Sequence, residues 1–386
     1  MRNRKLAGVV AAGALAVALA AWGSSGALAG KGTSATAGAA AAGTAQAADA
    51  KPAPMILPPK ASGKKYTIVL SNNYMGNEWR PQMENAAKHV AQLPGYRNRV
   101  DLKIENAQLT PTAQISSLQS IIRQRPDAIM IDAASATALN PTVEQACKAG
   151  ILVFTFDQTV TAPCAYKLPE QYAVQGKDMI EWLAKVLHGK GNILMDTGLA
   201  GIPISEEFVQ QWKSTIKKEY PGIHVVGTFS SQYAPGPELQ AVSSLLAQHR
   251  DIQGILSGGY CSSDLKALKQ AGLKAVPMTC LDVNGNEIDC AKAKLPCFFF
   301  GAPSFVSGIA INHIINLLDK RATYPKSQPF WKTNFVTKQG NIAFKHKQKV
   351  QPLTVGVNYY PTESPSLITP VDFDGFKLTP KAALGK

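Results

Sequence analysis

A regular alternation of short apolar runs and amphipathic helical segments, repeated twice along the chain, is the feature that most constrains its fold. Thr67–Leu70, Ala128–Ile131 and Ile151–Phe156 are apolar runs of the kind that buried parallel strands show. Segments with apolar residues at helical spacing lie between them. Because strands that alternate with helices pair in parallel, the sequence predicts an α/β fold of two doubly wound parallel-sheet lobes.

The two halves have the same expected order of four strands and intervening helices, and in each half the fourth strand ends in an aspartate, Asp157 or Asp282. We also expect a linker at Thr161–Pro169, a tight turn at Asn284-Gly285 and an irregular tail from Arg321. The other strands are expected at Val100–Glu105, Asn192–Asp196, Ile223–Phe229, Ile252–Ser257, Val276–Leu281, Cys297–Gly301 and, in the tail, Leu353–Tyr359.

These patterns divide the chain. We expect a signal peptide at 1–29, a flexible leader at 30–64, lobe 1 at 65–164 plus 301–330, and lobe 2 at 165–300. A C-terminal extension at 331–386 is expected to cross back towards lobe 2.

The N-terminus carries export signals. A basic start at Arg2–Lys5 precedes an apolar stretch, and the small residues Ala27 and Ala29 flank Leu28 as in a cleavage site. Trp22 stands where a bacterial lipoprotein has its lipid-bearing cysteine, so we expect cleavage after Ala29 and no lipid anchor. The predicted location is the periplasm.

Charge and cysteine content limit the partners. The formal net charge is +14, and the lysines that gather near the C-terminus are typical of a solvated basic face. Export argues against a nucleic-acid partner. The six cysteines include no C-x-x-C pair, so disulfides are favoured over a metal site. We expect a local disulfide between Cys290 and Cys297. Fifteen connectivities are formally open, and the other candidate pairs are Cys261 with Cys280 and Cys147 with Cys164.

The loop after the first strand is long and rich in polar and aromatic residues. It holds Asn72, Asn73, Tyr74, Asn77, Glu78, Trp79 and Arg80. Ligands of open α/β sheets bind at the carboxyl ends of strands, so this loop is a candidate binding loop. The alternative is a solvated loop whose Trp79 only packs on the sheet edge.

Four stretches together resemble the type I periplasmic binding proteins of ABC importers, in particular the ribose-binding-like group. They are the loop with Trp79, IMIDAASATAL (129–139), AGILVFTFDQ (149–158) and MTCLDVNG (278–285). The resemblance covers about residues 65–320. It implies two lobes, joined at a hinge by three crossovers, that close on a small polar ligand, usually a sugar, in the cleft between them.

The resemblance also implies roles for individual residues. Trp79 would stack on the ligand, and Asp157 would accept hydrogen bonds from its hydroxyls. The sequence departs from the family pattern at Gln158, where arginine is common, and at Ala302, where a polar residue is frequent. The candidate lining has more acid than base, which disfavours an anionic ligand. The full candidate set is Asn72, Asn73, Glu78, Trp79, Arg80, Asp132, Asp157, Gln158, Phe208, Gly259, Tyr260 and Asp282.

The resemblance implies an exported solute-binding protein, without a cofactor or metal, that delivers a sugar or polyol to a membrane permease; we expect a monomer. An exported carbohydrate-acting enzyme is the alternative, since paired carboxylates also serve glycosidases. The sequence has no G-x-S-x-G, P-loop, H-E-x-x-H or dinucleotide motif. The effector domain of a repressor is disfavoured by the signal peptide. The sequence does not distinguish a solute-binding protein from a ligand sensor that is coupled to a membrane receptor.

Overall fold

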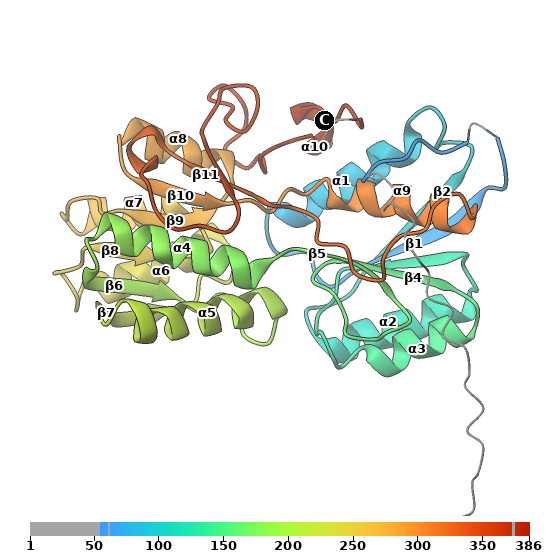
Figure 1. Cartoon of the computed structure of the whole chain (residues 1–386), viewed down its shortest axis with the longest axis horizontal. Helices are drawn as coiled ribbons and strands as arrows, with labels where there is room; N and C mark the ends of the chain where they lie inside the picture. The colour runs from blue at the N-terminus through green and yellow to red at the C-terminus, as the bar shows by residue number, and fades with distance from the viewer. Residues whose placement is uncertain (1–54, 61, 373–374) are drawn as a thin grey trace, which may run out of the picture. The chain divides into compact units, whose positions relative to one another are not determined.

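The computed structural model describes residues 55–60, 62–372 and 375–386, so the expected signal peptide and most of the expected leader lie outside the described residues. The described chain forms two sheets (Figure 1). One has five strands in the order β2-β1-β3-β4-β5, and the other has seven in the order β12-β11-β10-β9-β8-β6-β7. This confirms the predicted α/β class with two doubly wound sheets.

The first sheet is parallel throughout and has helices on both faces. Ile68 and Leu70 contribute to the same core as α1 (Trp79–Gln92) and α9 (Val306–Leu318). Val69, between them, lies in the core formed with α2 (Pro111–Arg123) and α3 (Asn140–Lys148), because successive strand side chains point to opposite faces. Its strands are β1 (Tyr66–Asn72), β2 (Val100–Asn106), β3 (Ala128–Ile131), β4 (Leu152–Asp157) and β5 (Tyr166–Pro169).

The second sheet also has helices on both faces, but it is not parallel throughout, because β11 runs antiparallel to β10. Phe298 and Phe300 of β10 (Cys297–Phe300) pack in the core with α4 (Tyr172–Val186) and α5 (Pro203–Glu219). Phe299 faces the core formed with α6 (Pro235–Leu246) and α7 (Cys261–Gln270). The other strands are β6 (Lys190–Asp196), β7 (Gly222–Phe229), β8 (Gly254–Leu256), β9 (Met278–Leu281), β11 (Thr333–Val336) and β12 (Lys349–Pro352).

Three local predictions differ from the structure. The expected linker contains β5, which pairs with β4 in the first sheet, although residues from 165 onward were assigned to lobe 2. The predicted strand Leu353–Tyr359 is wrong: β11 and β12 precede it, and only an isolated bridge joins Val355 to Tyr359. The predicted turn at Asn284-Gly285 is the start of α8 (Asn284–Lys292). Each of these segments is too short to show a clear strand or helix periodicity in the sequence.

The C-terminal extension contacts both lobes. β11 and β12 extend the second sheet, with β11 antiparallel to β10. We call residues 364–372 and 375–386 the C-terminal strap. Its Leu367 carbonyl accepts the backbone N–H of Asn284 at 2.8 Å, and its Ile368 N–H donates to Gln82 Oε1 of α1 at 2.9 Å. Its last helix, α10 (Pro380–Ala383), lies beside α1 (Figure 1).

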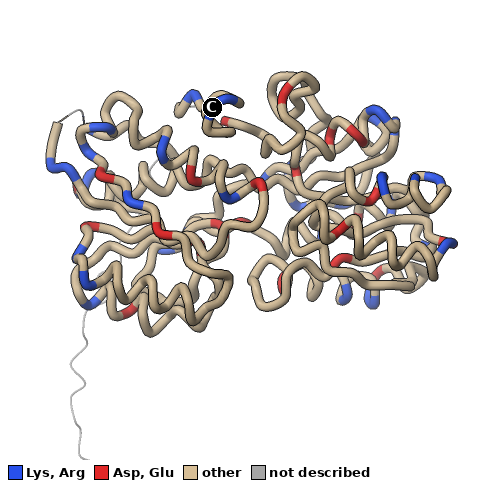
Figure 2. Tube along the Cα trace, turned by 180° about the vertical axis from the view of Figure 1, so that it is seen from behind, with Lys and Arg blue, Asp and Glu red and all other residues tan. Residues whose placement is uncertain are grey.

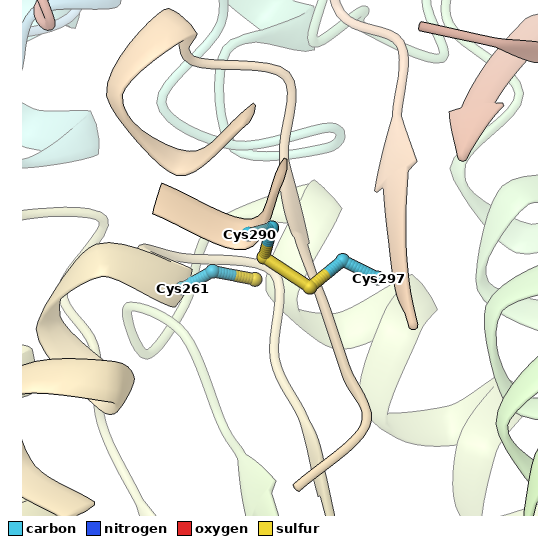
Figure 3. A group of neighbouring side chains, drawn as sticks. All are labelled: Cys261, Cys290 and Cys297. Atoms are coloured by element: carbon cyan, nitrogen blue, oxygen red, sulfur yellow. A yellow bond between two sulfur atoms is a disulfide. The ribbon is translucent and has the colours of Figure 1, made fainter. Parts of the chain in front are cut away.

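Three disulfides confirm all three candidate pairs: Cys147–Cys164, Cys261–Cys280 and Cys290–Cys297. The Sγ atoms of Cys261, Cys290 and Cys297 lie within 4.8 Å of one another, and all three residues are buried (Figure 3). Because each of these sulfurs is bonded to another sulfur, none is a free thiolate that would bind a metal.

The charged surface agrees with the expected solvated basic face. The C-terminal lysines are exposed, and Figure 2 shows lysine and arginine spread over outer loops and helix ends. Among the described residues, no helix is both long enough and apolar enough to cross a bilayer. The exposed lysines are Lys332, Lys338, Lys345, Lys347 and Lys349.

Candidate functional site

A cavity of about 40 Å³ lies where the carboxyl ends of strands from both sheets meet. The first lobe contributes the loop after β1 and the end of β4. The second contributes the ends of β9 and β10, the start of α5 and the loop after β7. The lining residues are Tyr74, Asn77, Trp79, Arg80, Asp157, Gln158, Tyr172, Ile202, Ile204, Tyr233, Leu281, Phe300 and Ala302.

The loop after β1 is ordered by Asn77. Its Oδ1 accepts the backbone N–H of Arg80 at 3.2 Å, and its Nδ2 donates to the Tyr74 hydroxyl at 3.0 Å. The first bond satisfies an N–H at the start of α1, as a cap does. A Cβ on Gly76 would lie 2.7 Å from the Tyr74 ring, so glycine lets the tyrosine fold back over the loop. The loop thereby presents Trp79 and Arg80 to the cavity.

Trp79 links the two lobes. Its indole Nε1 donates to the backbone carbonyl of Ala302, directly after β10, at 2.6 Å. The side chain is buried, and a buried tryptophan N–H normally has such a partner. The ring therefore has a fixed position at the cavity wall.

Arg80 is a buried cation with a buried partner. Its Nη1 donates to Asp132 Oδ2, and the guanidinium lies 4.7 Å from the Tyr74 ring centroid and 5.0 Å from that of Trp79. Asn72 Oδ1 lies 3.4 Å from the same nitrogen. Losing one partner of such a pair leaves an uncompensated buried charge, at a cost of about 3–5 kcal/mol. Asp132 thus holds Arg80 in place from behind.

Asp157 ends β4 in an unusual backbone conformation, with φ +56°. Aspartate accepts the left-handed region more readily than most residues. Its Oδ1 accepts a hydrogen bond from the Tyr172 hydroxyl. Burial raises the pKa of the Asp157 carboxyl, and the Arg80 guanidinium opposes that shift. Burial, followed by the charge of Asp157, raises the pKa of Tyr172 well above its ordinary value.

The second lobe places carboxylates close behind the cavity. Asp282 Oδ2 accepts the N–H of Ala302 at 3.0 Å, while Oδ1 has no partner. Burial, followed by the charge of Glu287, raises the pKa of Asp282 well above its ordinary value. In the same lobe, Glu238 Oε2 accepts the Tyr260 N–H at 2.5 Å. A Cβ on Gly259 would lie 2.1 Å from that oxygen, so a larger residue there would displace the Glu238 carboxylate.

The structure brings part of the predicted set to the cavity. Trp79, Arg80, Asp157 and Gln158 line it. Asn72 and Asp132 lie behind Arg80, whereas Glu78 and Tyr260 contact each other across the two lobes. The remaining predicted residues, Asn73, Phe208, Gly259 and Asp282, are not in the lining.

Phe208 has a different surrounding from the one expected. It is buried between Trp212, at a ring centroid distance of 5.1 Å, and Phe300, at 5.0 Å, and its ring edge meets Tyr172 at 5.7 Å. It therefore supports two lining rings from beneath, and its assignment as a ligand contact stays a prediction.

Tyr74 and Asn77 belong to the predicted binding loop, although not to the set of predicted individual contacts, whereas sequence reasoning missed Tyr172 and Tyr233 among the lining residues. Tyr233 follows β7, so the rule that ligands bind at carboxyl ends of strands would have found it if applied to that strand. Tyr172 gave no signal, because it follows the unrecognised strand β5. The other residues missed are Ile202, Ile204, Leu281, Phe300 and Ala302, of which Ala302 is identified in the sequence only as a departure from the family pattern.

Comparison with known proteins agrees with this geometry. The family model described as "Periplasmic binding protein domain" matches residues 68–321. The galactofuranose-binding protein YtfQ of Escherichia coli is 26% identical over 220 residues, which cover 54% of this chain and 67% of that protein. The ribose import binding protein RbsB of Bacillus subtilis is 24% identical over 201 residues, 52% of this chain and 64% of that protein, slightly under two thirds of its length.

Solved structures show the same fold. The crystal structure of an ABC transporter solute binding protein from Thermobispora bispora is 27% identical, with a TM-score of 0.63 over 69% of this chain and 84% of that one. A solute binding protein from Actinobacillus succinogenes with bound D-allose, 21% identical, has a TM-score of 0.61 over 70% of this chain and 97% of that one. The second likeness shows the fold alone.

Proposed function

Because this chain belongs to the periplasmic binding protein domain family, whose model matches residues 68–321, we propose that it is an exported solute-binding protein of an ABC importer. It captures a small polar ligand, a sugar or polyol, and delivers it to a membrane permease. The names of its relatives support this choice, since one is a galactofuranose-binding and another a ribose import binding protein.

The observation that carries the proposal is a cavity whose wall comes from strand ends of both sheets. A ligand held there contacts both lobes only when they are together. The ligand therefore shifts the equilibrium from the state with separated lobes to the closed state, by the difference between its affinities for these two states. A permease that binds the closed state would then distinguish loaded from empty protein.

The side chains of the wall suit a neutral hydroxylated ligand. Trp79, Tyr172, Tyr233 and Phe300 offer ring surfaces for the apolar faces of a sugar. Asn77, Asp157 and Gln158 offer amide and carboxylate groups for its hydroxyls. Arg80 and Asp157 bring one charge of each sign, so the wall itself does not demand a charged ligand. Asp132 and Asp282 act in this proposal by holding Arg80 and the Ala302 segment.

The proposal includes export to the periplasm with cleavage after Ala29, no lipid on Trp22, and a monomer. It also includes the absence of catalysis. Mass spectrometry of the mature N-terminus tests the processing, and a lipid-modified N-terminus would contradict it. Incubation with the bound sugar followed by its recovery unchanged tests the absence of catalysis.

A thermal-shift screen against pentoses, hexoses and polyols tests ligand binding, with calorimetry on each positive. A ligand present at 1,000 Kd and bound only by the folded state stabilises it by about 4 kcal/mol, a shift that melting detects. Failure of every sugar and polyol to raise the melting temperature would overturn the proposal.

A further inference from the structure

A second cavity adjoins the first and is much larger, with a volume of about 380 Å³ against about 40 Å³. Asp157, Gln158 and Tyr172 line both, so these three side chains form a common wall. The second cavity also includes Lys167 of β5, Glu170 between β5 and α4, and Glu207 of α5. A ligand bound to the common wall thus lies beside Glu170.

Acidic groups dominate the second cavity. Asp157 and Glu170 are buried and Glu207 is exposed at its edge. The one cationic side chain in its lining, Lys167, donates from Nζ to the backbone carbonyls of Ala162 at 2.7 Å and Ala165 at 3.4 Å. None of the ion pairs found among the described residues joins Lys167 to a carboxylate. The lysine therefore does not neutralise the carboxylates by direct contact.

Two hydrogen-bond acceptors in this lining lack donors. Glu170 is 6% exposed and Gln158 is 2% exposed, yet neither Glu170 Oε2 nor Gln158 Oε1 has a hydrogen-bond partner. Buried polar atoms are normally paired, so unpaired acceptors in a cavity wall point to a donor supplied by a ligand. Burial, followed by the charge of Asp157, holds the pKa of Glu170 well above its ordinary value. A cation beside Glu170 would favour its ionised form.

We infer that the second cavity is a subsite for a protonated primary amine, and that the ligand is therefore an amine-bearing sugar whose ring lies against the common wall. This inference rests on the proposed function. An ammonium group has three N–H donors and a positive charge, so it supplies both what the two orphaned acceptors lack and what the carboxylates require. A hydroxyl offers one donor and no charge.

Isothermal titration calorimetry with D-glucosamine and D-galactosamine, against D-glucose and D-galactose, tests the inference. We expect at least one amino sugar to bind about 10-fold or more tightly than its neutral parent, because one charge-assisted hydrogen bond raises the affinity by about that factor. Glu170→Gln should reduce that ratio to within about twofold. Glu105→Gln, at an exposed glutamate at the end of β2, should leave the ratio intact.

A second measurement does not depend on the variant folding. If the Glu170 carboxyl loses its proton when the ammonium arrives, binding of the amino sugar should release a proton that binding of the neutral sugar does not. The release appears as a dependence of the binding enthalpy on the ionisation enthalpy of the buffer. Equal or tighter binding of the neutral parents, without proton release by the amino sugars, overturns the inference and leaves the proposed function standing. Binding of none of the four sugars, nor of any member of the wider sugar and polyol panel, overturns both.

Discussion

The hydroxyl of Tyr260 donates a hydrogen bond to Glu78 Oε2, joining the loop after β8 in one lobe to the residue before α1 in the other. Tyr260 is buried, whereas Glu78 is half-buried. Trp79, the next residue, makes its own bond to Ala302. Two consecutive residues of the first lobe therefore hold two strand ends of the second, at the rim of the cavity.

The first prediction follows from this contact. Tyr260→Phe removes the hydroxyl and keeps the ring, so the lobes lose one bond that exists only when they are together. Because Glu78 is partly solvated, the bond contributes about 1 kcal/mol, which corresponds to roughly fivefold weaker ligand binding. Calorimetry should show this loss, and stopped-flow kinetics should place most of it in faster dissociation. Tyr220→Phe, at the end of α5, serves as the control; an unchanged affinity in Tyr260→Phe would show that the contact does not stabilise the bound state.

The second prediction concerns Asp157. Asp157→Asn keeps the size and the tolerance of the left-handed backbone but removes the charge. We expect ligand binding to weaken by about 10-fold or more, since charge-assisted bonds are worth about 1.5–3 kcal/mol. The unfolding free energy of the empty protein should stay level or rise, because burial disfavours the ionised carboxylate.

Calorimetry and urea unfolding measure the two effects separately. Asp289→Asn, at an exposed position of α8, controls for loss of a negative charge alone. If Asp157→Asn bound ligand within about twofold of the wild type, Asp157 would not be a ligand residue.

The fold was predictable because its information is local. Runs such as Ala128–Ile131 are buried on both sides, and the helices between them carry apolar stripes; each pattern identifies its element without knowledge of the rest. β5, β11 and β12 have four residues each and contain no continuous apolar run, so their existence depends on their pairing with β4, β10 and β11. The start of α8 likewise depends on Asn284, whose Nδ2 donates to the carbonyls of Tyr360 and Ser364.

The candidate site was predictable to the extent that strand ends specify it. Asp157 and Trp79 lie at such ends and reach the cavity. Asp282 also follows a strand, but its side chain turns to the Ala302 N–H, and a strand end alone does not determine that choice. The second cavity includes Glu170, which follows β5. Because the sequence does not predict β5, it also gives no expected position for Glu170.

The third prediction is a pH dependence of stability. Burial raises the pKa of Glu287 from 4.5 to about 8, and its Oε1 accepts the Thr369 hydroxyl at 2.5 Å. The folded protein thus retains a proton that the unfolded chain releases near its ordinary pKa. The stability associated with this group is complete below pH 4.5 and is lost progressively as the pH rises to about 8, with a slope of about 1.4 kcal/mol per pH unit.

Urea unfolding at several pH values between 5 and 8 measures this slope. Glu287→Gln should flatten the curve by about that amount, since glutamine does not titrate. Glu363→Gln, at an exposed glutamate of the extension, should leave the curve unchanged. An identical slope in Glu287→Gln and wild type would show that Glu287 is ionised in the folded protein.

The last prediction concerns the C-terminal strap, which lies beyond residues 68–321 matched by the family model. Phe376 is 1% exposed; its ring edge meets Tyr96 at 6.5 Å, and its carbonyl lies 3.0 Å from His89 Nε2 of α1. Truncating a buried phenylalanine costs about 3–5 kcal/mol, so Phe376→Ala should lower the unfolding free energy by an amount in that range. Val357→Ala, at a residue 56% exposed in the same extension, should change it by less than about 0.5 kcal/mol. Urea unfolding of both variants makes the comparison. If the two variants were equally stable, the strap would be detached from α1 in solution, and its contacts would contribute nothing to the folded state.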